Sequence, residues 1–481
     1  MNGNNDNDKQ QKHTHDANSH IDSKTTSNSN INSNTDSSSN SNSNSNIDSS
    51  TVKTSDSNSN SNIDSSTVKT SDSNSNSNID SSTVKTSGNV ITTMKSTAVD
   101  NTKGIAITSN SIIKKISTSL SSLSLSLSSS SPSPNLLGLD TVLLIVASNR
   151  PQYLEKCLNY VIQYHPKTEV PIIITEDGNN DDVNRVVQDA KEKFSKIAPN
   201  VPFLHIHNPS AGTIYENGYF NLAHHFKWAL DSIFFNKQSL PETLSSINRV
   251  IILEEDLQIS PDFYEYFGSL KTMLDNDKTL LCVSAFNDNG FVNSVKDNKF
   301  LYRSDFFPGL GWMLPRRIWE EYSPIWPNAY WDDWLREPQR RKGRHIIRPE
   351  VSRTFHYGRK GVSNAEFGGF LDNIKLNDEF VKFSELDLTY LELESWESTY
   401  INTVKNSPIV TIDTFNDNNY YKEVRILYNR LEGGFDSFVH IAHWAGVMDN
   451  IKANVPRTAY KGIVSTWKGD VKVHITPSNM Q

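Results

Sequence analysis

Apolar runs that are typical of buried strands alternate with segments of helical periodicity between Thr141 and Glu254. The predicted strands are residues 141–147, 171–175, 203–207 and 249–254. The predicted helices are residues 182–196, residues 219–235 and the segment behind Pro151, where Leu154, Leu158 and Val161 recur at helical spacing until His165 and Pro166. This alternation indicates an α/β fold with a doubly wound, mostly parallel sheet. Because ligands of such sheets bind beyond the carboxyl ends of the strands, the polar residues there are the first candidates for function.

Only the part of the chain after residue 135 has the composition of a folded protein. Residues 1–135 are dominated by Ser, Asn, Thr and Asp, and the unit NIDSSTVKTSDSNSNS begins at Asn46 and again at Asn62, with a variant at Asn78. Such a segment has too little apolar surface to offset chain entropy, so we predict a disordered low-complexity tail. We expect a larger domain at residues 136–371 and a smaller one at residues 372–481. All 9 Trp of the chain lie in these two domains.

Charge and motifs exclude several classes of protein. The net charge is −8 and no basic stripe with interleaved aromatic residues is present, so a nucleic-acid binder is not expected. No GxGxxG or GxxxxGK[ST] motif occurs, which disfavours a dinucleotide or P-loop phosphate site. The sequence contains no uninterrupted run of about 18 apolar residues, so a membrane-spanning segment is not expected. The two cysteines, Cys157 and Cys282, are too few for a disulfide framework.

Three carboxylates follow the apolar strand at residues 249–254 in the stretch VIILEEDL. Glu254, Glu255 and Asp256 would repel one another, and a hard divalent cation is the usual physical reason to place such groups together. A cation here would also stabilise the charge that develops on a leaving diphosphate. The alternative is a solvated acidic turn that caps the next helix, beginning near Ser260.

Two aromatic segments, FFPGLGW at 306–312 and WPNAYWDDW at 326–334, flank a pair of carboxylates. Aromatic rings can stack on sugar faces, which suggests a carbohydrate pocket, whereas the alternative is an ordinary aromatic core with a tight turn. Asp332 or Asp333, desolvated by the indole rings, would have a raised pKa and suit proton abstraction from a sugar hydroxyl. Alternatively, both carboxylates pair with Arg336 and Arg340 on the following helix.

The segment GRKGVS at 358–363 brackets two cations with glycines. This pattern favours a mobile loop that closes over a diphosphate, rather than the solvated face that most charge runs form.

Ordered motifs along residues 142–477 resemble the N-acetylglucosaminyltransferase I family of inverting enzymes. The similar segments are residues 147–150, 176–177, 251–257 and 262–267, FFPGLGW, WDDW, IRPEVSRT, GRKGVS and GVMDNIKANVPR. The resemblance implies a GT-A-like fold and a Mn2+-dependent enzyme. Such an enzyme transfers GlcNAc from UDP-GlcNAc in β1,2 linkage to the α1,3-linked mannose of a mannose-terminated N-glycan. Alternatives are transfer to O-linked mannose on protein and an inactive sugar-binding relative.

The resemblance also implies roles for individual residues. Asp256 is the expected Mn2+ ligand and Asp332 the expected catalytic base. The expected donor-binding residues are Arg150, Asp177, His225, Glu254, Glu255 and Ser363. Glu255 departs from the Asp that the N-glycan enzymes usually have, and Ser148, Gly178 and Ile346 stand where the family commonly carries cysteines, which leaves Cys282 without its usual partner. A lumenal Golgi location with membrane association is implied by the resemblance, although no anchor precedes the fold.

Overall fold

The computed structural model describes residues 136–210, 218–236, 240–359, 361, 368–418, 420–429 and 435–480. The predicted low-complexity tail and Ser363 lie outside these residues. Among the helices that are described, none combines the length and the apolar character needed to cross a lipid bilayer.

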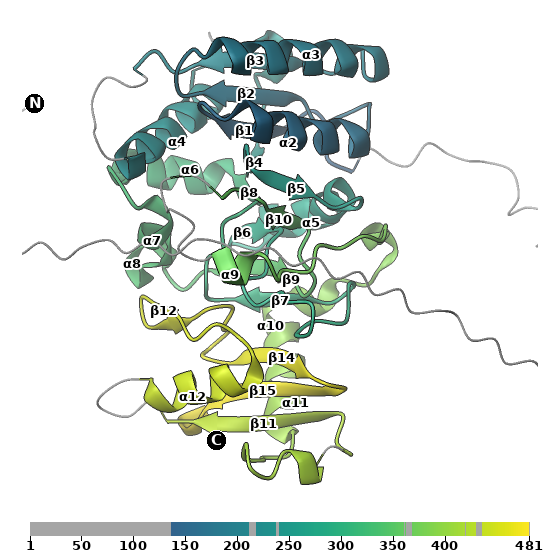
Figure 1. The fold of residues 1–481 in the computed structure, drawn as a ribbon, viewed down its shortest axis with the longest axis vertical. Coiled ribbons are helices and arrows are strands. Elements are labelled where there is room, and N and C mark those ends of the chain that lie inside the picture. The colour runs from purple at the N-terminus through teal and green to yellow at the C-terminus, as the bar shows by residue number, and fades with distance from the viewer. Residues whose placement is uncertain are drawn as a thin grey trace, which may run out of the picture. The chain divides into compact units, whose positions relative to one another are not determined.

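An eight-stranded sheet forms the centre of the described part of the chain, in the order β3-β2-β1-β4-β8-β6-β9-β7 (Figure 1). Its strands are β1 (Thr141–Ala147), β2 (Ile172–Glu176), β3 (Phe203–His207), β4 (Arg249–Glu254), β6 (Leu280–Ser284), β7 (Leu301–Ser304), β8 (Trp312–Pro315) and β9 (His345–Pro349). The first four strands are mutually parallel, and β6 is parallel to β9. β8 and β7 run antiparallel to their neighbours. The predicted α/β fold with a mostly parallel sheet is confirmed.

Alternate residues of β1 pack into two different cores, one on each face of the sheet. Leu143 and Ile145 belong to the core formed with α2 (Pro151–Tyr164), α3 (Asp181–Ile197) and α5 (Phe263–Asn276). Val142 and Leu144 belong to the core formed with α4 (Gly218–Phe234) and α6 (Arg316–Tyr322). A strand with a continuous apolar run from Val142 to Ala147 is therefore covered on both faces, as the segment TVLLIVA predicted.

The helices begin and end where the sequence signals them. α2 has Pro151 in its first turn and ends before His165, whose extended backbone suits the following Pro166. The side chain of Asn180 caps α3 by accepting hydrogen bonds from the backbone N–H groups of Asp182 and Val183.

A two-stranded antiparallel pair outside the main sheet decides the geometry of the site. β5 (Leu257–Ile259) directly follows the acidic triplet and pairs with β10 (Thr354–His356), with His356 opposite Leu257. Residues that are about a hundred positions apart in sequence therefore meet next to Asp256.

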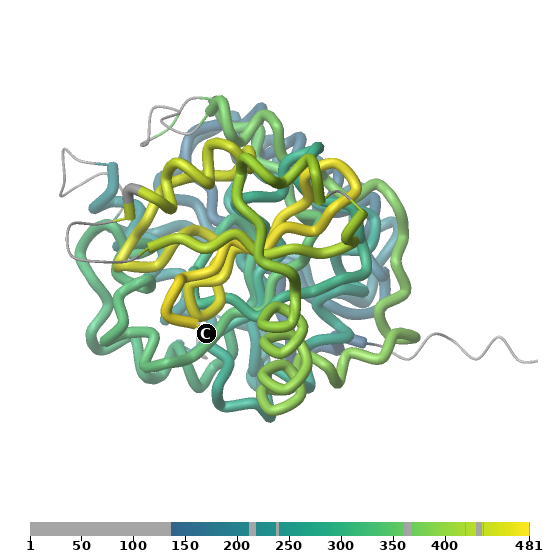
Figure 2. Tube along the Cα trace, turned by 90° about the horizontal axis from the view of Figure 1, so that it is seen from below, coloured from purple at the N-terminus to yellow at the C-terminus, as the bar shows by residue number. Residues whose placement is uncertain are grey.

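A second, three-stranded sheet in the order β11-β15-β14 lies in the C-terminal part of the chain. β11 (Glu423–Tyr428) is parallel to β15 (Val471–Pro477), and β14 (Val464–Lys468) is antiparallel to it. With α12 (Asp436–Ala445) these strands enclose a separate hydrophobic core. Figure 2 views the trace from this end, with the yellow C-terminal segments in front. The domain boundary at residues 371 and 372 stays a prediction.

Short elements complete the described chain. The helices are α7 (Trp331–Arg336), α8 (Pro338–Arg341), α9 (Gly368–Leu371), α10 (Leu393–Trp396) and α11 (Asn402–Asn406), and the remaining strands are β12 (Ile451–Lys452) and β13 (Val455–Pro456). A π-helical turn occupies Glu397–Ile401, and 3-10 turns lie at Glu242–Leu244, Ser323–Ile325, Phe383–Glu385, Thr389–Leu391, Asn416–Asn418 and Ser478–Met480.

Both cysteines are buried and free. Cys282 on β6 has Ile346 of β9 as its partner in the sheet register. The family that the sequence resembles commonly has a cysteine at the position of Ile346. In this chain an apolar side chain therefore lies opposite Cys282.

Candidate functional site

The strand order reverses at β1, which lies between β2 and β4. At such a switch point the loops after neighbouring parallel strands diverge and leave a crevice beyond their carboxyl ends. A cavity of about 530 Å³ lies there. Six of the eight predicted site residues line it, namely Arg150, Asp177, His225, Glu254, Glu255 and Asp256.

Asp256 is 3 % exposed and lines this cavity. Its Oδ2 lies 2.8 Å from Nη1 of Arg150 and 3.3 Å from Nε2 of His356. Burial opposes ionisation, but the hydrogen bonds and charges of His356 and Arg150 outweigh it and lower the pKa of Asp256. Its Oδ1 has no hydrogen-bond partner among the described residues, although it is buried. Buried carboxylate oxygens are normally partnered, so this atom is available to a cation.

Glu255 is held in an extended position by two contacts. Its Oε2 accepts a hydrogen bond from the Ser148 backbone N–H at 2.9 Å, and its Oε1 pairs with Nε of Arg150. Burial raises the pKa of Glu255 against the opposing influence of Arg150. Glu255 therefore positions Arg150 beside Asp256 rather than presenting a free carboxylate to the cavity.

Glu254 lines the same cavity from the last residue of β4. Burial, together with the negative charge of Asp256, raises the pKa of Glu254 to about 7. The alternative interpretation of the triplet as a helix cap is wrong, because β5 separates it from α5. The N-cap residue of α5 is Asp262, which instead pairs with the buried Arg353.

Asp177 lies immediately after β2, where its backbone N–H continues the ladder by donating to the carbonyl of Ala147 at 2.9 Å. Its Oδ1 accepts a hydrogen bond from Nδ2 of Asn208 at 2.9 Å, and burial raises its pKa. Asn208 follows β3 and was not predicted as a site residue. Asn208 is the first residue after β3, which is parallel to β2, and a polar residue at that strand end is the sequence signal that could have identified it.

His225 reaches the cavity from α4 and is 2 % exposed. Burial lowers its pKa to about 3, so the imidazole is neutral at physiological pH. Its Nε2 has no hydrogen-bond partner among the described residues. A neutral, unpartnered imidazole nitrogen suits a hydrogen bond to a bound ligand.

His356 is a further cavity residue that the sequence analysis missed. It comes next to Asp256 only because β10 pairs with β5, and no local pattern announces a contact between segments so far apart. Its Nδ1 is buried without a hydrogen-bond partner among the described residues. The neighbouring Tyr357 anchors this turn by donating to the carbonyl of Tyr153 at 2.9 Å.

The predicted base, Asp332, lies at the start of α7 and is not among the residues that line the cavity. Its Oδ2 lies 2.8 Å from Nη1 of Arg336, which also contacts Asp333 at 2.7 Å. The charge of Asp332 is one of the influences that raise the pKa of Glu254, after burial and Asp256, which places it near the acidic strand end.

The expectation that the carboxylate beside the indole rings has a raised pKa is wrong for Asp333. Its side chain is 41 % exposed, and although partial burial raises its pKa, Arg336 and Lys452 together hold that pKa below its usual range. Pairing with Arg336 is confirmed, whereas the expected pairing with Arg340 is wrong. Nε of Arg340 lies 3.5 Å from Oε2 of Glu337, and its guanidinium lies over the ring of Trp334.

The aromatic segments form core rather than a sugar platform. Trp312 and Trp326 each stack on Trp331, and all three rings belong to the core that includes residues of α4 and α6. Gly311, with φ of +95°, lets the backbone pass against Thr354 instead of a ligand. Tyr330 is an exposed ring of this region, and its centroid lies 4.5 Å from that of Tyr219 on α4, with the two ring planes tilted by 31°.

The predicted lid is described only in part. Gly358, Arg359 and Gly361 line the cavity, and Arg359 pairs with Asp372. Ser363 lies outside the described residues, so its predicted role stays a prediction.

The cavity beyond the carboxyl ends of β1, β2 and β4 places the protein in the class of α/β proteins that carry a ligand site at the switch point of the sheet. Within that class, the chain belongs to the GNT-I family, whose family model matches residues 61–481. The sheet and this membership confirm the predicted GT-A-like fold class.

A similar protein from Arabidopsis thaliana is named alpha-1,3-mannosyl-glycoprotein 2-beta-N-acetylglucosaminyltransferase. It is 38 % identical over 329 residues, which cover 67 % of this chain and 70 % of that protein.

Solved structures give more distant similarities. A Pyrobaculum calidifontis mannosyltransferase in complex with GDP-Man and Mn2+ matches with a TM-score of 0.30 and 12 % identity, covering 50 % of this chain and 65 % of that one. Residues 1–349 of S. aureus TarS match with a TM-score of 0.30 and 12 % identity, covering 55 % and 79 %. Similarities this weak add nothing to the site.

Proposed function

We propose that this protein is an inverting glycosyltransferase that transfers GlcNAc from UDP-GlcNAc, in β1,2 linkage, to the α1,3-linked mannose of N-glycans on glycoproteins. Membership of the GNT-I family and the 38 % identical Arabidopsis relative support this activity. The observation that carries the proposal is the cavity at the switch point, which is lined by Arg150, His225 and Asp256. The buried Oδ1 of Asp256 has no hydrogen-bond partner among the described residues.

The residues at the end of β4 fit a hard divalent cation, and we assign this position to Mn2+. Asp256 would hold the ion through Oδ1, with the imidazole of His356 close enough to contribute a second contact. When bound, Mn2+ supplies Lewis-acid stabilisation to a diphosphate leaving group. Arg150 adds a fixed positive charge at the same place, held there by Glu255.

The positions of the cavity residues support the proposed donor-binding roles. Asp177, fixed by Asn208, accepts hydrogen bonds from the uracil base at the β2 side of the cavity. His225 donates from its neutral imidazole to the diphosphate. Ser363 is assigned to the closing loop by its place in GRKGVS, together with the cations of that segment.

The chemical step is a single displacement with Asp332 as general base. The mannose O2 attacks the anomeric carbon of GlcNAc while Asp332 accepts its proton, and the bond from that carbon to UDP breaks. One displacement inverts the anomeric carbon, so no covalent enzyme intermediate forms. Arg336 orients the Asp332 carboxylate through an ion pair at 2.8 Å.

A lumenal Golgi site with membrane association is part of the same proposal and rests on family membership. Its test is the distribution of the tagged full-length protein between Golgi and cytosolic fractions. A uniformly cytosolic distribution would overturn it.

One assay tests the proposed activity. The purified protein is incubated with UDP-GlcNAc and a defined mannose-terminated N-glycan, with Mn2+ or with excess EDTA, and the linkage of the product is determined. We expect a β1,2 product that requires the metal. Preference for an O-mannosyl peptide would reassign the acceptor, activity in EDTA would remove the metal from the mechanism, and donor binding without any transfer would indicate an inactive sugar-binding relative.

A further inference from the structure

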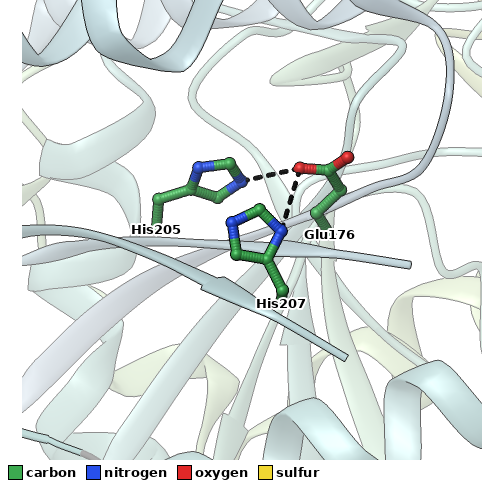
Figure 3. A group of neighbouring side chains, drawn as sticks. All are labelled: Glu176, His205 and His207. Carbon is green, nitrogen blue, oxygen red and sulfur yellow. Dashed lines mark ion pairs between the residues drawn. The ribbon is translucent and has the colours of Figure 1, made fainter. Parts of the chain in front are cut away.

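Two histidines and a glutamate gather on the edge of the large sheet, on its α2 and α3 side. His205 and His207 are alternate residues of β3, so their side chains project from the same face. Glu176, the last residue of the neighbouring β2, is the register partner of His207. Figure 3 shows both imidazole rings turned toward the Glu176 carboxylate.

The three side chains present their ligand atoms at the spacing of a metal site. Oε2 of Glu176 lies 3.0 Å from Nε2 of His205 and 3.3 Å from Nδ1 of His207, and the three atoms lie within 4.8 Å of one another. A tetrahedral zinc ion with bonds of about 2.0–2.2 Å separates its ligand atoms by roughly 3.4 Å. The three atoms therefore need only small shifts to share one ion.

Burial makes this carboxylate costly without a partner for its charge. The Glu176 side chain is fully buried, and Oε1 accepts a hydrogen bond from the Asn180 backbone N–H at 2.6 Å. Oε2, by contrast, has no hydrogen-bond partner among the described residues, and neither does Nε2 of His205. The two atoms are at hydrogen-bonding distance but lack the alignment of a hydrogen bond. A buried carboxylate oxygen and a buried imidazole nitrogen, each without a hydrogen bond, are satisfied together by a cation.

Two nearby groups compete with an ion. Nδ1 of His207 lies 3.2 Å from the Gly178 carbonyl, so in the metal-free state its proton is donated there. Binding moves that proton to Nε2, which is allowed because the His207 side chain is 39 % exposed. The second group is Lys191 on α3, a positive charge near His205. The pKa of His205 is lowered by burial first, then by His207 and by Lys191.

We propose that Glu176, His205 and His207 form a binding site for zinc or a similar borderline divalent ion, with solvent at the exposed side completing the coordination. Two imidazoles and one carboxylate favour zinc over Mn2+, whereas the carboxylate cluster at Asp256 favours a hard cation. The site is separate from the proposed donor cavity, because neither His205 nor His207 lines it.

The ion would fasten the ends of two strands next to the donor site. Glu176 directly precedes Asp177, and His207 directly precedes Asn208, whose side chain donates to Asp177. An ion shared by Glu176 and His207 would therefore fix the backbone on both sides of that hydrogen bond. This consequence rests on the proposed function, but the existence of the site does not.

The experiment measures zinc binding directly on the full chain, stripped of metal, by competition with a chromophoric chelator. The variant is the double substitution H205A/H207A. The matched control is H13A/H15A, because the tail carries a second His-x-His sequence at His13 and His15 that can bind zinc by itself. We expect the double variant at 205 and 207 to lose one equivalent of tight zinc binding, which H13A/H15A retains.

Thermal unfolding locates the ion in the folded part. Zinc that binds the folded state and not the unfolded chain raises the midpoint of unfolding. We expect this rise in the natural protein and in H13A/H15A, and its absence in H205A/H207A. Should the double variant fail to fold, the single substitution His207→Ala, at a half-exposed position, replaces it and should weaken zinc binding by at least about 10-fold. Equal zinc affinity and equal midpoint shifts in all these proteins would overturn the proposal.

Discussion

Gly358 packs so closely against Asp256 that a methyl group added to the glycine would overlap Oδ2 of the carboxylate. No side chain fits at this position unless Asp256 moves. The loop that carries Gly358 also carries His356, so the glycine allows the loop to cover the acidic strand end.

Gly358→Ala is therefore expected to weaken cation binding. Forcing an extra methyl group into a packed site costs about 1–3 kcal/mol, which corresponds to about 5- to 150-fold in affinity. The measurement is a Mn2+ titration followed by electron paramagnetic resonance of the free ion. Gly361→Ala is the control, because its added methyl group would lie at 3.4 Å from Nη1 of Arg150 and needs little adjustment. Equal Mn2+ affinity in both variants would contradict this assignment of Asp256.

The first half of the sheet was predictable because its signals are local. β1, β3 and β4 have the bounds predicted from their apolar runs, and β2 differs by one residue at each end. Continuous apolar strands between helical segments leave few arrangements other than a parallel sheet. Since the carboxyl ends of parallel strands share one edge, the residues after β1, β2 and β4 were expected to meet, and they do.

The rest of the site depends on contacts between distant segments. His356 reaches Asp256 only through the pairing of β10 with β5, and Asn208 reaches Asp177 only because β3 lies next to β2. The interpretation of the aromatic segments as a carbohydrate pocket failed for a related reason. A ring in a sugar site and a ring in a core have the same sequence signature, and only the packing of Trp312 on Trp331 distinguishes them.

Asp332→Asn should abolish transfer while leaving donor binding intact. The amide cannot accept the proton of the attacking hydroxyl, and the loss of a general base typically lowers kcat by about 100- to 10,000-fold. Asp333→Asn is the matched control, because it also contacts Arg336 and lies one residue away. We expect Asp333→Asn to keep most of the turnover, measured as UDP release with saturating acceptor. Comparable losses in both variants would point to a structural role through Arg336.

Glu255 tests how much the length of one side chain matters. Its carboxylate spans from the Ser148 N–H to Arg150, and aspartate in the same place is one methylene too short to keep both contacts. Loss of one partner of a buried charge costs about 1–3 kcal/mol, so Glu255→Asp should lower the free energy of unfolding by that amount. Glu255→Gln keeps the length of the side chain but removes its charge. If the main role of Glu255 is to hold Arg150, Glu255→Gln should weaken donor binding more than Glu255→Asp does. The measurements are urea unfolding and UDP-GlcNAc titration, and unchanged values for both variants would contradict the role.

His165 makes the stability of the fold depend on pH. It closes the turn after α2, in which Lys167 and Val170 have positive φ angles. Its Nδ1 accepts a hydrogen bond from the Lys167 N–H at 2.9 Å, and its Nε2 lies 2.9 Å from the Val170 carbonyl, so Nε2 carries the proton. Both nitrogens are used only in the neutral form, and burial lowers the pKa of His165 to about 4.

Because the folded state holds the neutral imidazole, its contribution is fully present above the unfolded pKa of about 6.5 and is lost as the pH falls toward 4. A shift of this size corresponds to on the order of 3 kcal/mol over that window. His165→Gln, which does not titrate, should be less stable at pH 7 but should lose less stability between pH 6.5 and 4. Other histidines whose pKa is lowered to about 4 by burial, such as His205 and His345, also titrate in this range, and the difference between the two unfolding curves removes their contribution. Parallel pH profiles for the natural protein and His165→Gln would show that the turn tolerates a charged imidazole.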